Sequence, residues 1–330
     1  MILAGDIGGT KVELALYDGP PNKTKPAFAK RYPSRDFSGL EVIVADFLKT
    51  HPCGGVEGAS FGIAGAVKDG VVHTTNLPWV VTEKKLSDTV GGAPASLLND
   101  LEANAWGIGV LEEDEIETIH PGEGLEGNRA LISAGTGLGI AGLYWDEDRG
   151  EHLPFASEGG HASFAPQEEI DLELYHHLKD KYKGTVSWER VLCGKALVDI
   201  YHFLVARAGK ESPRWLEEEM MEGDAAAAVS KAGQQNKDDF CVEALELFTR
   251  YYGAQAGNTA LNFLALGGLY IGGGIAPKML DQLRDRTFLD AYLNKGRLRP
   301  TVESIPVRVI LNPKTALLGA AVHAGRQCRK

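Results

Sequence analysis

The chain has 330 residues, of which 44% are hydrophobic and 24% are charged, and its formal net charge at pH 7 is −11. A chain of this length usually forms more than one hydrophobic core, so we expect two domains. The acidic balance disfavours proteins that bind nucleic acid or an anionic membrane, since these normally present a basic face. It is compatible with a phosphate ligand, because backbone N–H groups and a metal ion can bind phosphate locally.

The start of the chain and its cysteines indicate the compartment. The first residues, MILAGD, lack the basic region of a signal peptide. The most apolar stretch, TALNFLALGGLYIGGGIA, contains five glycines and reads as a helix end, a buried strand and a turn rather than a membrane span. The cysteines at 53, 193, 241 and 328 form no Cys-x-x-Cys pair, which disfavours a cysteine-rich zinc site. We therefore expect a soluble cytoplasmic protein.

Strand-like and helix-like segments are intermixed along the chain, which predicts an α/β fold. Apolar runs typical of strands lie at residues 2–4, 12–17, 58–67, 70–76, 95–99, 130–135, 139–145, 267–274 and 307–311. Helical periodicity occurs at residues 100–111, 168–182, 196–209, 238–266 and 315–328. Residues 2–18 and 130–146 share one order of parts: a strand, a glycine-rich turn, a second strand, then Leu-Tyr and an acidic residue. This repeat predicts two related halves with a ligand cleft between them.

Three common site motifs fail on their context. GASFG at 58–62 matches the nucleophile elbow of hydrolases, but a strand-like run rather than a helix follows the serine. GLGIAG at 137–142 matches the dinucleotide fingerprint, but it too leads into a strand. No P-loop sequence occurs in the chain. These patterns therefore predict neither a hydrolase nor a dehydrogenase.

The opening turn, GDIGGTK at Gly5–Lys11, has two interpretations. A plain hairpin needs only its two adjacent glycines. Those glycines can also adopt positive φ and let the backbone approach a phosphate closely. Thr10 supplies a hydroxyl group, Lys11 a cation, and Asp6 a carboxylate suited to Mg²⁺ directly or through water.

Two later glycine-rich turns favour the phosphate interpretation. SAGTGLG at Ser133–Gly139 also carries a threonine, so two turns of this type can hold a polyphosphate from both sides. GGGIAPKML at Gly272–Leu280 runs from a strand through glycines into a helix start, with Pro277 in its first turn. Its flat glycine surface suits the base and ribose of a nucleotide. The three turns together predict a nucleotide site.

Polar residues that suit a sugar occur at three places. Asn99 and Asp100 lie between a strand end and a helix start, where helix capping is the simpler interpretation. Capping needs only one of them, so we expect Asp100 to accept the proton of a substrate hydroxyl. Glu158 and His161 flank two glycines in a segment that is otherwise a surface loop. Glu189 stands at a probable helix start, where it can equally serve the helix dipole. Carboxylate, amide and imidazole groups all hydrogen-bond vicinal hydroxyls.

These motifs resemble, in content and order, those of the bacterial glucokinases. The resemblance covers nearly the whole chain through GDIGGTK, LLNDLEANAWGI, SAGTGLG, PFASEGGH, SWERVLCG and YIGGGIAPK. It implies the two-domain, actin-like (ribonuclease H-like) ATPase fold with a cleft between the domains. The implied small domain spans residues 1–105 and 314–330, and the large one spans 106–313. The cysteine-rich zinc motif of the repressor and kinase branch is absent from the sequence, which favours the zinc-free branch.

The resemblance also implies roles for individual residues. Glucose contacts are expected from Asn99, Asp100, Glu158, His161 and Glu189, with Asp100 as general base. ATP and Mg²⁺ are the expected cofactors, with Asp6 toward the metal. Expected cofactor-binding residues are Gly5, Asp6, Ile7, Gly8, Gly9, Thr10, Lys11, Gly135, Thr136, Gly137, Gly272, Gly273 and Gly274. Family members are commonly homodimers.

The expected activity is phosphorylation of glucose at its 6-hydroxyl by ATP, with closure of the two domains on the sugar. One alternative is a kinase of another hexose, such as mannose, or of an N-acetylhexosamine, which keeps the phosphate turns and changes the sugar pocket. The other is a non-catalytic sugar-sensing regulator. The acidic chain and a first strand that begins at residue 2 disfavour the regulator.

Overall fold

The structure is a computed structural model and describes residues 1–19, 25–74 and 77–328. The chain divides into two compact units. Unit 1 comprises Met1–Ile116, Asp146–Ala156 and Asn312–Lys330, and unit 2 comprises Glu117–Trp145 and Ser157–Leu311. The domain boundaries expected from the sequence, at residues 105 and 314, stay a prediction.

The first sheet holds five strands in the order β3-β2-β1-β4-β7. They are β1 (Ile2–Ile7), β2 (Lys11–Tyr17), β3 (Phe28–Pro33), β4 (Gly58–Ile63) and β7 (Ala95–Asn99). Strands β1, β4 and β7 are parallel, while β1, β2 and β3 pair antiparallel. The carboxyl ends of β1, β4 and β7 therefore share one edge of the sheet, which is where α/β proteins place their functional groups.

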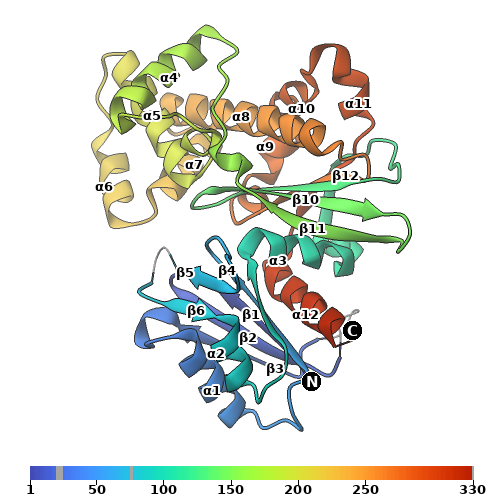
Figure 1. Ribbon diagram of the computed structural model, residues 1–330. Coiled ribbons are helices and arrows are strands. Elements are labelled where there is room, and N and C mark those ends of the chain that lie inside the picture. The colour runs from blue at the N-terminus through green and yellow to red at the C-terminus, as the bar shows by residue number, and fades with distance from the viewer. Residues whose placement is uncertain (20–24, 75–76, 329–330) are drawn as a thin grey trace. The chain divides into compact units, whose positions relative to one another are not determined.

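Both faces of this sheet are covered by helices (Figure 1). Because side chains alternate along a strand, Leu3 packs into the core that contains Phe47 of α1, whereas Ile2 and Ala4 pack against Leu317 of α12. The helices of unit 1 are α1 (Leu40–Thr50), α2 (Glu83–Thr89), α3 (Asp100–Gly107) and α12 (Thr315–Gln327), with η1 (Ser34–Asp36), η2 (Ile108–Val110) and η3 (Glu113–Glu115). A small ladder joins β5 (Val71–His73) to β6 (Val80–Thr82). The last helix of the chain thus completes the fold of its first strands.

The second sheet has six strands in the order β11-β10-β9-β12-β13-β8. They are β8 (Ile116–His120), β9 (Arg129–Ala134), β10 (Leu138–Asp146), β11 (Glu151–Ser157), β12 (Gly268–Gly272) and β13 (Val307–Ile310). Strand β9 pairs antiparallel with β10 and parallel with β12. The β9–β10 hairpin and the end of β12 therefore bring two of the predicted glycine turns to one edge.

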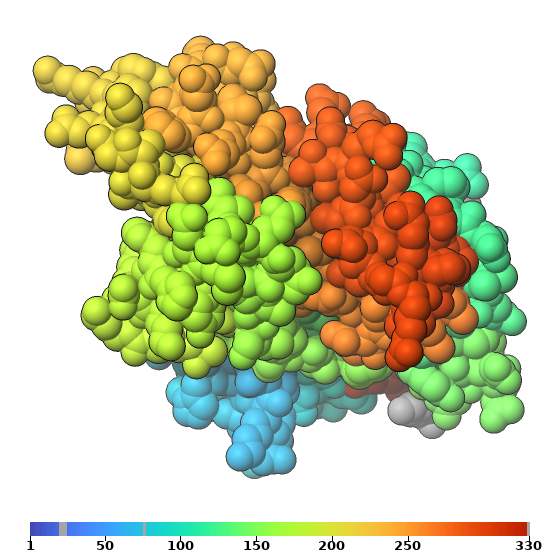
Figure 2. All heavy atoms as spheres, turned by 90° about the horizontal axis from the view of Figure 1, so that it is seen from above, coloured from blue at the N-terminus to red at the C-terminus, as the bar shows by residue number. Residues whose placement is uncertain are grey.

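Helices of unit 2 pack around one large hydrophobic core, centred on the 25-residue α8. They are α4 (Glu169–Tyr182), α5 (Gly194–Arg207), α6 (Arg214–Glu222), α7 (Ala225–Gln234), α8 (Asp239–Phe263), α9 (Leu280–Arg284), α10 (Arg286–Leu293) and α11 (Arg299–Glu303). Short 3-10 helices are η4 (Gly159–His161), η5 (Trp188–Arg190), η6 (Ala276–Met279) and η7 (Gly296–Leu298). Figure 2 looks onto these helices, with α6 (yellow) at the rim and α10 beside α11 (orange-red).

The expected α/β class is confirmed, and each predicted strand or helix coincides with an element of that type. The strands predicted at 58–67 and 70–76 are shorter, at Gly58–Ile63 and Val71–His73, and residues 75–76 lie outside the described ones. Ser60 of the GASFG motif is buried inside β4 and hydrogen-bonds the His323 ring, so it forms no nucleophile elbow. Among the described residues, no helix combines the length and apolarity needed to cross a bilayer.

Candidate active site

The opening turn joins β1 to β2 and is held from the side by η1. The Gly8 N–H donates to the Lys11 carbonyl (2.9 Å) and closes the turn. The buried Ser34 donates its Oγ to the Gly8 carbonyl (2.8 Å), and its N–H donates to the Thr10 carbonyl (3.0 Å). Neither Gly8 nor Gly9 is among the residues with positive φ, so the turn does not use the backbone freedom that the sequence suggested for it. Its shape depends on this external anchor.

Asp6 is the main ionisable group beside this turn. It lies on β1 opposite Glu13 of β2. The pKa of Asp6 is raised to about 6, mainly by burial; the Lys11 and Arg31 cations lower it, and the Glu13 and Asp100 carboxylates raise it. A buried carboxylate that is costly to ionise is stabilised by any cation that reaches it.

Glu13, the neighbour of Asp6, is buried and held by cations. The Arg31 Nε lies 2.7 Å from one of its oxygens, and the Lys314 Nζ lies 3.8 Å from the other. Glu13 is therefore compensated within unit 1, and Asp6 is the member of the pair better placed to meet a ligand cation.

Asn99 and Asp100 lie at the carboxyl end of β7, on the same sheet edge as Asp6. Asn99 caps α3 by accepting the Leu101 N–H (2.9 Å), and its amide donates to the Gly65 carbonyl (3.1 Å). The expected cap by Asn99 is present, but Asp100 is not left free of contacts, because its carboxylate oxygen accepts the same N–H at 2.9 Å. This shared contact fixes the Asp100 side chain at the start of the helix. Each oxygen of a carboxylate can accept more than one hydrogen bond.

The second glycine turn, Gly135–Gly137, joins β9 to β10 in unit 2. The Gly135 N–H donates to the Gly137 carbonyl (2.9 Å), which closes the turn. The Gly194 N–H, at the start of α5, donates to the Gly135 carbonyl (2.8 Å). Glu189 accepts the Leu138 N–H at 3.0 Å on the other side. The turn is therefore fixed on both sides by one segment of chain.

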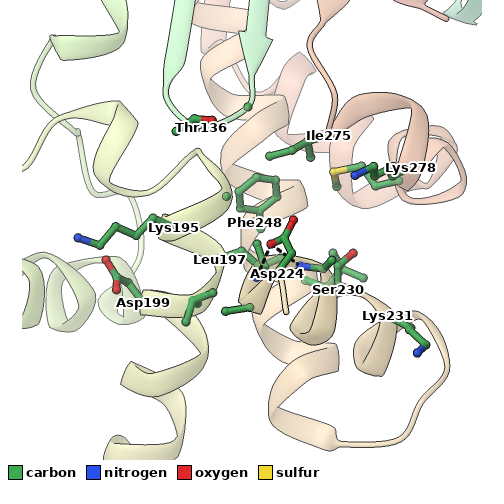
Figure 3. Close-up of a pocket in the computed structure, with 18 of the residues that line it drawn as sticks. Thr136, Lys195, Leu197, Asp199, Asp224, Ser230, Lys231, Phe248, Ile275 and Lys278 are labelled. Atoms are coloured by element: carbon green, nitrogen blue, oxygen red, sulfur yellow. Dashed lines mark hydrogen bonds between the residues drawn. The ribbon is translucent and has the colours of Figure 1, made fainter. Parts of the chain in front are cut away.

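A cavity of about 1080 Å³ opens beside this turn and is lined entirely by unit 2 (Figure 3). Gly135 and Thr136 form one wall, and Gly274 and Ile275 form another. Small-molecule sites typically measure about 300–1,000 Å³, so this cavity has room for a nucleotide. Two of the three predicted glycine segments thus meet around one space.

The third glycine segment shapes the turn after β12. Gly273 has a φ of +86°, and a Cβ atom there would lie 2.5 Å from the Ala134 carbonyl oxygen and 2.6 Å from the Ser133 Oγ. Only glycine fits both the dihedral angle and the space. Pro277 stands in the first turn of η6, as predicted. Gly274, by contrast, has open space and faces the cavity.

Glu158, His161 and Glu189 come from two adjacent 3-10 helices, η4 and η5. The His161 Nε2 lies 3.9 Å from a Glu158 carboxylate oxygen, and both side chains are exposed. Gly160, between them, packs so closely that a Cβ atom would lie 1.9 Å from the Leu138 carbonyl oxygen. The helix start predicted at Glu189 is a single 3-10 turn, and the carboxylate reaches the Gly135–Gly137 turn by accepting the Leu138 N–H.

Comparison with known proteins identifies the family of the chain. A family model described as Glucokinase matches residues 3–327. The curated glucokinase of Trichormus variabilis is 40% identical over 345 residues, and the alignment covers 99% of each chain. The chain belongs to the glucokinase family.

Solved structures of glucokinases share the fold. A crystal structure of a glucokinase from an Antarctic psychrotroph matches with a TM-score of 0.86 and 29% identity, over 98% of each chain. A ROK-family glucokinase from Streptomyces griseus, solved with glucose and AMPPNP, matches with a TM-score of 0.62 and 24% identity over 99% of each chain, which supports the fold alone. The expected two-domain, actin-like fold is confirmed by these matches.

Within each unit the structure groups the predicted site residues of this glucokinase-family chain. Unit 1 places Asp6, the Gly8–Thr10 turn, Asn99 and Asp100 at one sheet edge. Unit 2 places the Gly135–Gly137 turn beside Glu189 and beside the cavity.

The sequence did not predict several residues that anchor the first glycine turn or line the cavity. Ser34 anchors the first turn, and the cavity is also lined by Lys195, Asp224, Phe248 and Lys278. Asp224 lies in the middle of Figure 3 and caps α7 through the N–H groups of the next residues. Its N-cap position before four alanines was a readable helix signal. Lys278 lies inside the GGGIAPKML stretch, although no role was expected for it. Lys195 and Phe248 carry no motif, because α5 and α8 bring them to the cavity only in three dimensions.

The residues at Asp6 fit a magnesium ion of the kind that kinases use. Mg²⁺ is usually held by one or two carboxylates, substrate phosphates and waters rather than by a protein cage. Among the residues that the structure describes, no group of three or more His, Cys, Asp or Glu side chains could hold a metal. A single partly buried carboxylate such as Asp6 agrees with binding through one carboxylate, phosphates and waters.

Proposed function

We propose that the chain transfers the γ-phosphoryl group of ATP to the 6-hydroxyl of glucose, giving glucose 6-phosphate and ADP. The observation that carries this proposal is the 1080 Å³ cavity between the Gly135–Thr136 turn and Gly274, in a chain of the glucokinase family. Glycine-rich turns expose backbone N–H groups, which bind phosphate oxygens. The adenosine part of ATP would occupy the cavity, and its phosphates would extend along the turn.

Five residues are proposed to bind glucose: Asn99, Asp100, Glu158, His161 and Glu189. Their amide, carboxylate and imidazole groups suit vicinal hydroxyls. Support comes from a related structure of a Balamuthia mandrillaris glucokinase solved with glucose, which shares the fold at a TM-score of 0.78.

Asp100 is proposed as the general base. Its carboxylate would accept the proton of the 6-hydroxyl while that oxygen bonds to the γ-phosphorus and the bond from the γ-phosphorus to the β–γ bridging oxygen breaks. The contact with the Leu101 N–H orients the carboxylate. Because the transition state is loose, orientation and charge stabilisation contribute more than covalent chemistry.

The charge of the phosphates is proposed to be balanced by Asp6-bound Mg²⁺, Lys11 and the N–H groups of both glycine turns. Magnesium, when bound, neutralises negative charge on the transferring group. The partly buried Asp6 carboxylate would hold that ion directly or through water. A homodimer, a cytoplasmic location and the two domain boundaries remain parts of this proposal that rest on the sequence.

A coupled assay across hexoses tests the proposal. We expect ADP release with glucose at a kcat/KM at least about tenfold above that with mannose, fructose or N-acetylglucosamine, since one mispaired buried hydroxyl contact costs about 1–3 kcal/mol. A preference for another sugar would contradict the assignment of glucose but leave the kinase assignment intact. Absence of turnover with every sugar would contradict both.

A further inference from the structure

The second glycine turn is supported along its length by the segment Trp188–Gly194. At one end of this segment a Glu189 carboxylate oxygen accepts the Leu138 N–H at 3.0 Å. At the other end the Gly194 N–H donates to the Gly135 carbonyl at 2.8 Å. Gly135 follows the end of β9, and Leu138 is the first residue of β10, so these two residues are the ends of the turn. One segment therefore fixes both sides of the turn that borders the nucleotide cavity.

The fit between Glu189 and this turn is tight. A Cβ atom at Gly137 would lie 2.5 Å from the same carboxylate oxygen that accepts the Leu138 N–H. Gly137 is not among the glycines with positive φ, so its dihedral angles do not demand glycine. The lack of a side chain at Gly137 instead leaves room for the carboxylate.

The backbone that carries Glu189 is itself held firmly. The Trp188 N–H donates to the Ala162 carbonyl, and the Phe164 N–H donates to the Val186 carbonyl, both at 2.9 Å. The Phe164 ring packs edge-on against Trp188, with ring centroids 5.0 Å apart, and both rings are buried. This firmly packed backbone limits how far the Glu189 carboxylate can move when a ligand binds.

Behind those rings lies a buried polar network. Tyr251 packs against Phe164 with centroids 5.4 Å apart and donates its hydroxyl to Asp171 at 2.8 Å. Asp171 is buried and also pairs with Arg250 at 2.5 Å. A satisfied network of this kind is rigid and resists rearrangement. The support for Glu189 thus extends from the turn to the core of unit 2.

We propose that Glu189 is a positioning residue for the nucleotide: its carboxylate holds the Gly135–Gly137 turn in the conformation that binds phosphate. This role is separate from the sugar contact assigned to the same residue above, and it rests on the proposed function. Without the carboxylate, the Leu138 N–H loses its acceptor and the turn loses one of its two lateral supports. Nucleotide affinity then falls even when no sugar is present.

Calorimetric titration of the full chain with MgADP, without any sugar, tests the role. For Glu189→Ala we expect binding weaker by about tenfold, the effect of losing one hydrogen bond to a charged group. Glu189→Gln keeps an oxygen that can accept the N–H and should stay within about threefold of the wild type. Glu158→Ala, the matched control, removes a carboxylate assigned only to the sugar and should leave MgADP affinity unchanged. Wild-type affinity in Glu189→Ala would overturn the inference.

Two further variants keep the test decisive if Glu189→Ala fails to fold. Glu189→Asp retains the charge but shortens the side chain by one methylene, so it should weaken MgADP binding about as much as alanine does. Gly137→Ala should also weaken binding by displacing the carboxylate, and much less so in a Glu189→Ala background. Fully additive effects would contradict the contact. Sugar-dependent turnover of the wild type is measured separately. Failure of the proposed kinase function can therefore be told apart from failure of the role proposed for Glu189.

Discussion

The two glycine turns show how one sequence pattern can serve two purposes. The turn at Gly8–Thr10 is anchored by Ser34, and the cavity that Gly8 and Gly9 line measures about 10 Å³, barely the space of one water molecule. The turn at Gly135–Gly137 is anchored by Glu189 and Gly194 and borders a cavity of about 1080 Å³. Ionisable side chains lie beside the first turn, and a large cavity lies beside the second.

This difference assigns separate tasks to the two units. Unit 1 contributes carboxylates, Asp6 and Asp100, at the carboxyl ends of parallel strands. Unit 2 contributes the 1080 Å³ cavity and the Gly135–Gly137 turn beside it, where we propose that the nucleotide binds. Substitutions in unit 1 are therefore expected to change turnover more than nucleotide affinity, and substitutions at the second turn are expected to do the reverse.

Asp100→Asn should show the largest effect. The amide oxygen can still accept the Leu101 N–H, so the helix cap and the stability should be retained. The amide cannot take up a proton, so we expect kcat to fall by at least ~10²-fold with glucose and MgADP still bound. Steady-state kinetics and calorimetry measure the two quantities. Turnover near the wild-type value would contradict the role of Asp100 as general base. It would also weaken the proposal that the two units have different roles.

Gly273→Ala should destabilise the turn after β12, next to the cavity that Gly274 lines. Alanine at a φ of +86° is strained, and its Cβ atom would overlap the Ala134 carbonyl. We expect the free energy of unfolding to fall by about 2–4 kcal/mol. Gly274→Ala is the matched control: its Cβ atom meets open space, so unfolding should change by less than about 1 kcal/mol. Urea titrations of the ligand-free proteins compare them, and equal losses would show that the turn tolerates a side chain throughout.

Asp6→Asn should raise the stability of the protein and slow its turnover. Its folded-state pKa of about 6 lies above its ordinary value of 3.8. The folded state therefore binds more protons than the unfolded state between about pH 4 and 6, and the free energy of unfolding falls as pH rises through that window. At pH 7 the substitution removes this cost, so we expect a gain of about 1–3 kcal/mol without nucleotide or Mg²⁺, together with slower turnover.

The pH dependence provides the check on Asp6. Between pH 4 and 6 the advantage of Asp6→Asn over the wild type should grow, and it should level off above pH 6. Thermal unfolding at several pH values measures it. A constant difference between the two proteins at every pH would show that ionisation of Asp6 is not the cause.

Much of this organisation could be predicted from the sequence because local patterns encode it. The strands, the long α8 and the three glycine turns follow from periodicity and turn chemistry within short windows. The anchors could not be predicted. Ser34 reaches Gly8 across the end of β3, and Glu189 reaches Leu138 from a segment about fifty residues away, so both contacts exist only once the chain has folded. The shared cap at Leu101 was missed because simple N-cap rules assign one side chain per helix start.

Ser34→Ala should give the smallest effect and sharpens the comparison most. It removes the Oγ contact to the Gly8 carbonyl but keeps the backbone contact to Thr10, so we expect about 1 kcal/mol of lost stability. Turnover should fall severalfold while MgADP affinity stays unchanged, whereas Glu189→Ala should weaken MgADP binding.

Ser87→Ala is the control for that variant, because Ser87 makes a similar 2.8 Å bond to the Ala93 carbonyl within unit 1 but away from the turn. It should cost similar stability and leave turnover intact. If Ser34→Ala instead weakened MgADP binding as strongly as Glu189→Ala does, the two turns would share one task, since loosening either would then disturb the same ligand.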